Sequence, residues 1–279
     1  MGDCAEKRND IPSGYEQLTY IESTGTQYID TGIKVGDVYG YDVRYQSTGK
    51  VTSSTWGLLD GVFGVNSSGA DTKIWYIYSK NKPGVNIGLR GGSGISYYYP
   101  SYDTYYAAIH HVKVETDGTV WYNGENLGML SDFKTATKTG DITLFTVYDA
   151  NESKPFFYSK TRMYHVKFYG ESQALLGDFV PCKRVSDGVL GMYDAVSGTF
   201  FTNKGTGTFL SAPLTYTIPI LNNGTKVAEI IRSAPLYAGD SISYRGDGLP
   251  AVSLSSGSNS LTIGTAVQPG SVTYRYDTY

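Results

Sequence analysis

The residues of this 279-residue chain best suited to recognition chemistry lie in one tyrosine-rich segment, YYYPSYDTYY. It contains Tyr97, Tyr98, Tyr99, Tyr102, Tyr105 and Tyr106. Aromatic faces stack on the apolar C–H faces of sugar rings, and each tyrosine adds a hydroxyl at low entropic cost. We interpret the segment as a loop that presents rings to a glycan. The same composition suits a subunit interface or ordinary packing, and the sequence leaves both alternatives open.

The acids and histidines do not have the spacing of a catalytic centre. Retaining glycosidases use two carboxyl groups about 5–5.5 Å apart, and the Glu-x-Asp-x-x-Glu pattern that would place such a pair on one strand does not occur. The histidines are His110, His111 and His165. His110 and His111 are adjacent on an expected strand and therefore point to opposite faces. We expect no enzymatic activity.

The composition argues against some classes of binding partner. The net charge is −3, whereas a nucleic-acid binder usually carries a basic surplus. No apolar run approaches the ~20 residues of a membrane helix, so we expect neither nucleic acid binding nor membrane insertion. Cys4 and Cys182 are too few for a disulfide framework and are expected as free thiols. The opening MGDCAEKRND lacks the apolar core of a signal peptide.

The elements that position these residues are expected to be strands. Runs rich in Tyr, Val, Ile, Thr and Phe alternate with Gly, Asn, Asp and Ser turns. The expected strands are Gln17–Glu22, Gln27–Asp30, Tyr39–Tyr45, Lys73–Tyr78, Val85–Leu89, His110–Glu115, Thr119–Asn123, Ile142–Tyr148, Met163–Tyr169, Leu175–Pro181, Val189–Tyr193 and Thr199–Thr202. Val112 and Val114 alternate with Lys113 and Glu115, which is typical of a half-buried antiparallel strand. Trp56, Trp75 and Trp121 are expected in the core.

Turn signals complete the fold prediction. Asp117-Gly118 lies between two strand-like runs and predicts a hairpin, because glycine accepts the positive φ of a primed turn. Asn123-Gly124 ends the second of those strands. Many short strands with frequent turns predict an all-β protein, a two-sheet antiparallel jelly-roll sandwich. No long amphipathic helix is convincing, and the best candidate, Ala228–Arg232, reads equally well as strand.

The composition changes after Ser211-Ala212-Pro213, which divides the chain into three parts. We expect an N-terminal arm over residues 1–13, the jelly roll over 14–212 and a small β-sandwich module over 213–279. Alternatively, the last part packs on the jelly roll as extra strands.

Three stretches carry a family resemblance. GYEQLTYIESTGTQYIDTG (Gly14–Gly32), HVKVETDGTVWYNGENLG (His111–Gly128) and DFVPCKRVSDGVLGMYDAVSGTFFTNKGTGTF (Asp178–Phe209) resemble a laminin-G-like, concanavalin-A-like jelly-roll domain. This variant is found in surface proteins of gut bacteria and their phages. The resemblance is specific to this variant of the fold and not to one biochemical activity. It also allows a calcium ion at a rim, for which the loop acids are Asp60, Asp71, Asp103, Asp149 and Glu152, although their spacing is not diagnostic and no cofactor is required.

The resemblance and the missing signal pattern together suggest a phage virion surface protein, namely a head fibre, a capsid decoration or a tail fibre. Such a protein would be made in the host cytoplasm and displayed on the virion surface. Its expected partners are further copies of itself as a trimer, other virion proteins and host or mucosal glycans. The alternative is a bacterial surface or secreted carbohydrate-binding protein.

Overall fold

A computed structural model describes residues 8, 10–49, 59–66, 72–79, 82–92, 94–133, 140–214, 216–222, 225–232, 241–244, 252–255, 261–262 and 271–273. The chain divides into two compact units, and the boundary falls between Ala212 and Pro213. The larger unit is Asn9–Ala212 and contains the tyrosine-rich segment. Most of the expected N-terminal arm, together with Cys4, Trp56 and Asp71, lies outside the described residues.

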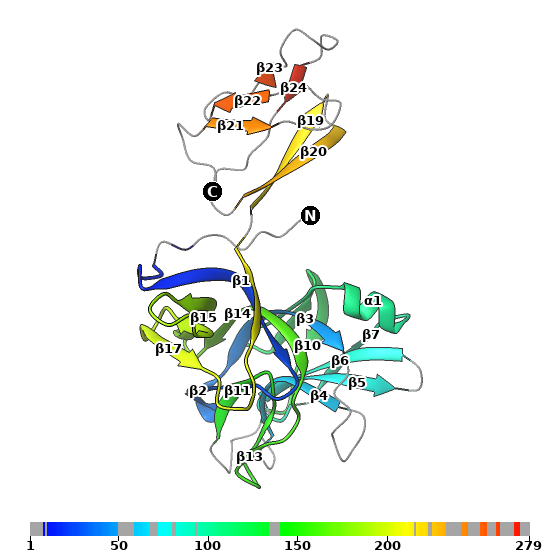
Figure 1. The fold of residues 1–279 in the computed structure, drawn as a ribbon. Helices are drawn as coiled ribbons and strands as arrows, with labels where there is room; N and C mark the ends of the chain where they lie inside the picture. The colour runs from blue at the N-terminus through cyan, green and yellow to red at the C-terminus, as the bar shows by residue number, and fades with distance from the viewer. Residues whose placement is uncertain are drawn as a thin grey trace. The chain divides into compact units, whose positions relative to one another are not determined.

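In the described part of the larger unit, ten strands form one sheet, here called sheet A (Figure 1). Its strands are, in spatial order, β10 (Glu125–Met129), β9 (Thr119–Tyr122), β8 (His110–Val114), β3 (Gly40–Gly49), β14 (Lys160–Tyr169), β1 (Tyr15–Thr24), β15 (Leu175–Arg184), β16 (Leu190–Asp194) and β17 (Thr199–Thr202), with β18 (Leu210–Pro213) paired to β1. Along the path from β10 to β17, every neighbouring pair of strands is antiparallel.

The second sheet, sheet B, has eight strands in the same part of the chain. They are β13 (Lys154–Pro155), β12 (Tyr148–Asp149), β4 (Leu59–Asn66), β5 (Thr72–Ser79), β6 (Lys82–Gly88) and β7 (Ile95–Tyr98), with β11 (Asp141–Leu144) paired to both β4 and β2 (Ile29–Lys34). The pairing of β12 with β4 is parallel, and the others are antiparallel. A short 3₁₀ turn, η1 (Val35–Asp37), follows β2.

The two sheets pack face to face around one aromatic core. Tyr41 of β3 contacts Phe63 of β4 edge to face, with ring centroids 4.9 Å apart. Phe63 in turn contacts Phe168 of β14 at 5.6 Å, and all three rings are fully buried. These contacts join sheet A to sheet B, so the predicted all-β sandwich of two antiparallel sheets is confirmed.

The opening and closing stretches of the sequence meet in space. Gln27, which is buried, donates from Nε2 to the carbonyl oxygen of Thr208 at 3.1 Å. Its Oε1 accepts the backbone N–H of Thr24 at 2.8 Å. Beside it, the backbone of Thr26 accepts from the Thr206 N–H at 3.1 Å. One buried amide therefore fastens the end of β1 to the loop that leads into β18.

Both predicted hairpins are present, but the first does not have the expected primed turn. The Gly118 N–H donates to the Glu115 carbonyl oxygen at 2.9 Å, and of the pair Asp117-Gly118 only Gly118 has a positive φ. β8 and β9 pair with Val114 opposite Val120, and Gly118 between them has a φ of +94°. β9 and β10 turn at Asn123 and Gly124, whose φ values are +49° and +84°, as a type I′ turn requires. One expected strand was too long, because Phe145 has a φ of +67° and separates β11 from β12.

The smaller unit consists, where it is described, of two sheets. One contains β20 (Thr225–Arg232), β19 (Tyr216–Asn222), β24 (Ser271–Thr273) and β23 (Leu261–Thr262), and the other pairs β21 (Ser241–Tyr244) with β22 (Val252–Ser255). The ambiguous Ala228–Arg232 stretch is strand, within β20. Among the described residues, no helix has the length and apolar character that a membrane crossing requires.

Candidate functional site

The tyrosine-rich segment is not the open loop that the sequence predicts. Its first part is β7, and its second part forms a one-and-a-half-turn helix, α1 (Tyr102–Ala107). Ser101 caps this helix, because its Oγ accepts the Thr104 N–H at 3.2 Å. Thr104 Oγ1 accepts the Ser101 N–H at 3.2 Å in return, which completes a capping box. The cap holds a short helix of poor helix formers in a fixed place.

The six tyrosines divide by exposure. Tyr98 and Tyr102 are exposed, at 47% and 37%. Tyr97, Tyr99 and Tyr106 are half-buried. Tyr105 has no exposed surface, so its assignment as a ring presented to a ligand is wrong. Its ring belongs to the buried core of the sandwich.

Tyr105 is the anchor of the segment. Its ring lies 4.5 Å from the His110 ring and 5.4 Å edge to face from the Tyr99 ring, measured between centroids. Burial raises the pKa of the Tyr105 hydroxyl far above its ordinary value. The exposed residues Tyr98 and Tyr102 therefore belong to a segment that is held in place by packed aromatic rings.

Tyr99 and His110 also belong to a hydrogen-bonded network that extends into the core. Tyr122 Oη is 2.6 Å from His110 Nδ1, and Tyr99 Oη is 2.9 Å from Tyr122 Oη. Asn123 Nδ2, at the surface, donates to Tyr99 Oη at 3.4 Å. Burial lowers the pKa of His110 to about 3, although an interaction with the Tyr105 backbone opposes this shift. Burial thus favours the neutral form of His110, which has no exposed surface.

Sequence reasoning missed a second cluster, on the outer face of sheet A. Nε2 of His111 (β8) lies 2.8 Å from Asp42 Oδ1 of β3. His165 Nε2 of β14 lies 3.2 Å from the same oxygen. The predicted separation of His110 from His111 is correct, because His110 is buried and His111 is half-exposed. The two outward histidines converge because β3 lies between their strands.

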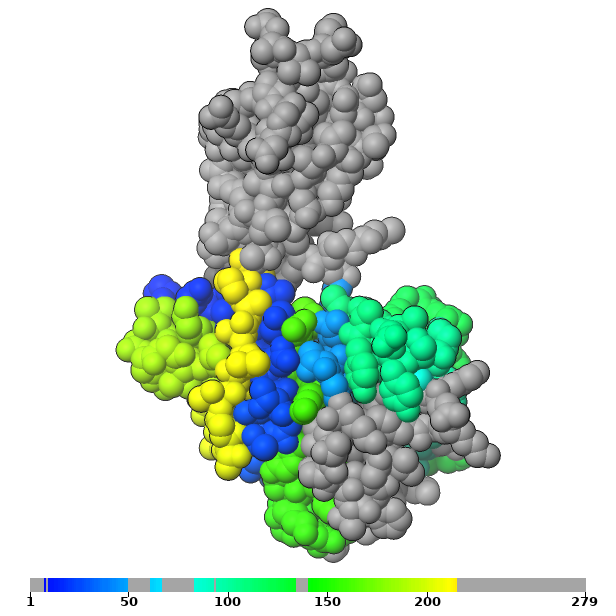
Figure 2. All heavy atoms as spheres, turned by 45° about the vertical axis from the view of Figure 1, so that its right-hand side comes forward, coloured from blue at the N-terminus to red at the C-terminus, as the bar shows by residue number. Residues whose placement is uncertain are grey.

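A β-bulge in β14 shapes this face. The register shifts between Met163 and His165, so that Tyr164 and His165 are both half-buried on the outer side. Tyr164 Oη donates to Gln46 Oε1 at 3.2 Å. Gln46 Nε2 donates to the carbonyl oxygen of Tyr106 at 2.8 Å, which connects this face to α1. Figure 2 shows β3 in light blue beside the blue-green α1 segment, with β14, in green, between β3 and the blue β1.

The remaining ring and acid candidates lie elsewhere. Trp121 is half-buried and lies in β9 between the inward residues Val120 and Tyr122, so its expected place in the core is wrong. Asp149 accepts the Asn151 and Glu152 N–H groups on Oδ1, at 2.8 and 3.2 Å, and so stabilises a turn. Asp103 is exposed in the first turn of α1. Over the described residues, no group of three or more His, Cys, Asp or Glu side chains is arranged to hold a metal ion.

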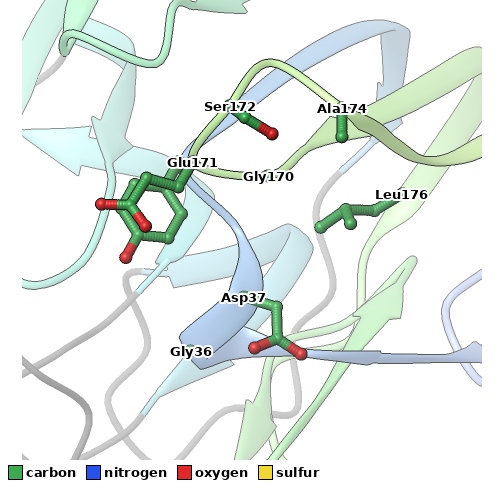
Figure 3. Close-up of a pocket in the computed structure, with 8 residues that line it drawn as sticks. Gly36, Asp37, Gly170, Glu171, Ser172, Ala174 and Leu176 are labelled. Atoms are coloured by element: carbon green, nitrogen blue, oxygen red, sulfur yellow. The ribbon is translucent and has the colours of Figure 1, made fainter.

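An open recess of about 590 Å³ lies between η1 and the turn that joins β14 to β15 (Figure 3). Its acids are Asp37 and Glu171, and its apolar wall is Leu176. Figure 3 shows the Glu171 and Asp37 carboxyl groups on different sides of the recess. The recess therefore does not present a convergent pair of acids.

A scan against protein-family models and a search of curated proteins gave no match to this chain.

Proposed function

We propose that this chain is a non-enzymatic recognition protein whose larger unit binds glycans through Tyr98 and Tyr102. The observation that carries the proposal is that one short segment contains two exposed rings, Tyr98 and Tyr102, and a fully buried one, Tyr105. The Ser101 cap holds the helix of this segment in place. A ring that is already held in place loses little conformational entropy when a sugar stacks on it. Its hydroxyl can then donate to or accept from the sugar.

The remaining half-buried rings support the exposed pair. The centroids of Tyr102 and Tyr106 lie 6.3 Å apart, and Tyr97 packs at 4.7 Å from Tyr122. Two exposed rings offer few contacts to a sugar, so a single site would bind weakly. Several copies in an oligomer would convert weak sites into firm attachment through avidity. This arrangement is what adhesion requires, and it needs no reactive centre.

The proposed setting is the surface of a phage virion, as a head fibre, capsid decoration or tail fibre. The support for this setting is the resemblance of the Gly14–Gly32, His111–Gly128 and Asp178–Phe209 stretches to jelly-roll domains of gut phages. A homotrimer docked on other virion proteins is the proposed assembly. Mass spectrometry of purified virions should detect the chain. Its presence in a bacterial envelope fraction, and not in particles, would favour a bacterial surface protein instead.

The glycan surface is tested with a Tyr98→Ala/Tyr102→Ala variant on a glycan array and on host cells. Both signals should fall at least about tenfold, because two stacking faces are lost, while the melting temperature changes little. Tyr98→Phe/Tyr102→Phe should retain most of the binding, since the faces remain. Met129→Ala, at a residue 62% exposed on β10, is the matched control for loss of surface apolar area. Unchanged binding with a smaller oligomer would identify the segment as a subunit interface and overturn the glycan site.

A further inference from the structure

The open recess between η1 and the turn that joins β14 to β15 has two walls that are held in place (Figure 3). On the η1 side, Arg90 Nη1 donates to the Gly36 carbonyl oxygen at 3.4 Å. On the turn side, the Gly170 N–H donates to the Ala174 carbonyl oxygen at 2.8 Å. Because hydrogen bonds fix both walls, a ligand would meet a recess that is already formed.

The recess has an apolar surface that is also fixed. Tyr39 lines it, and the Tyr39 backbone N–H donates to the Tyr169 carbonyl oxygen at 2.8 Å. Arg90 Cζ lies 4.0 Å from the centroid of the Tyr39 ring, so a cation–π contact orients that ring. Leu176, which also lines the recess, is partly buried and packs against the main core. An aromatic ring and an aliphatic side chain can therefore contact the C–H groups of a ligand.

The charged groups of the recess are hydrogen-bond acceptors. Asp37 and Glu171 are both exposed, and neither carboxyl group forms a hydrogen bond or an ion pair with a residue that the structure describes. Lys34, whose charge interacts with that of Asp37 at longer range, is paired with Asp141. Among the described residues, the lining of the recess contains these two carboxyl groups and no cationic side chain.

The position of the two carboxyl groups restricts the class of ligand. They lie on different sides of the recess, so they can contact one ligand from two directions. An ionised carboxylate accepts hydrogen bonds and cannot donate them, so the ligand must supply the donors. A negatively charged ligand would be repelled. The recess is therefore complementary to a ligand with several hydroxyl groups, an apolar face and no negative charge.

We propose that this recess is a binding site for a neutral sugar ring. The sugar hydroxyls donate to the Asp37 and Glu171 carboxylates in charge-assisted hydrogen bonds. The C–H groups of the sugar pack against Tyr39 and Leu176. The recess volume of about 590 Å³ lies within the range of about 300–1,000 Å³ that is typical of small-molecule sites.

The test is an NMR titration of the isotope-labelled full chain with methyl β-glucoside, methyl β-galactoside, methyl α-mannoside and N-acetylglucosamine. Each sugar is added up to about 50 mM, because one small ring should bind with a Kd on the order of millimolar. At least one sugar should shift the backbone amide signals of Gly36, Asp37, Gly170 and Ser172. The uronic acid of the sugar that binds should bind at least about fivefold more weakly, because it adds a third carboxylate.

Two variants assign the binding to the recess. Gly36→Phe places a ring in it and should weaken sugar binding at least about tenfold. A Cβ at Gly36 meets no atom within 4 Å, so the chain should still fold. Gly14→Phe is the matched control, because a Cβ there also meets no atom within 4 Å and Gly14 does not line the recess. Asp37→Asn/Glu171→Gln should weaken binding of the neutral sugar at least about threefold and remove the discrimination against its uronic acid.

The recess shares no residue with the glycan surface at Tyr98 and Tyr102, so the two sites are tested separately. Tyr98→Ala/Tyr102→Ala should retain the sugar-dependent shifts at the recess. Circular dichroism checks that each variant is folded. Three results would overturn the proposal: no neutral sugar shifts these amide signals, binding survives Gly36→Phe, or a simple amine such as lysine methyl ester binds more tightly than every sugar.

Discussion

Tyr122 Oη lies 2.6 Å from Nδ1 of His110, inside the core, where the His110 ring also packs 4.5 Å from the Tyr105 ring. A neutral histidine has one donor and one acceptor nitrogen, so Nδ1 and the Tyr122 hydroxyl share one hydrogen bond whichever of them donates. The Tyr122 hydroxyl also lies 2.9 Å from Tyr99 Oη. Burial of the His110 ring favours its neutral form.

Stability should therefore decrease in mild acid. The pKa of His110 is about 3 in the folded chain, against about 6.5 when unfolded. Between these two pH values the unfolded state binds more protons than the folded state. The free energy of unfolding therefore increases with pH over this range, and it decreases as the pH falls below 6.5. The expected loss is about 1–2 kcal/mol between pH 6.5 and pH 5. Urea denaturation at a series of pH values measures it.

His110→Gln is the control for that loss. Glutamine offers Tyr122 an amide oxygen but does not titrate, so the variant should be less stable at pH 7 yet lose less stability on acidification. The exposed histidines are present in both proteins, and their effects cancel in the difference. Equal pH slopes in the two proteins would mean that His110 is not the group responsible.

Tyr105 and Tyr98 should respond in opposite ways to truncation, although they lie in the same segment. Tyr105→Ala removes a fully buried ring and should cost about 3–5 kcal/mol in unfolding free energy. Tyr98→Ala removes a ring that is 47% exposed, so it should cost less than about 1 kcal/mol and reduce binding instead. Thermal denaturation and a glycan-binding assay on both variants separate the two roles. A stable Tyr105→Ala protein would contradict the role of Tyr105 as the anchor of the segment.

The sequence predicts periodic and turn-directed features well, and features that arise between strands poorly. The alternation of Val112 and Val114 and the Asp117-Gly118 hairpin follow from local rules, and both are found. Helix α1 was missed because its tyrosines have weak helix propensity, and its stability comes from the Ser101 cap and from burial of Tyr105. The convergence of His111 and His165 on Asp42 requires the strand order β8–β3–β14, which no local pattern encodes.

Gln27 should be the most sensitive polar residue of the opening stretch. Its buried amide donates to the Thr208 carbonyl oxygen and accepts from the Thr24 N–H. Gln27→Ala would leave both backbone groups without this partner, at a cost of about 1–3 kcal/mol. Asn126→Ala, at an exposed amide whose Oδ1 accepts the Gly128 N–H within β10, should cost less than about 1 kcal/mol. Chemical denaturation gives both values, and equal costs would show that Gln27 does not join the two ends of the domain.

Gly191 should tolerate no side chain, because the hairpin of β16 and β17 leaves no room for one. A Cβ at this position would lie 2.2 Å from the Phe201 carbonyl oxygen, and backbone on a paired strand cannot easily move away. Gly191→Ala should therefore destabilise the unit by about 2–4 kcal/mol. Gly36→Ala is the matched control, because a Cβ there meets no atom within 4 Å. Denaturation of both variants tests the packing of the closing strands. A Gly191→Ala protein as stable as Gly36→Ala would show that β17 does not pair with β16 as described.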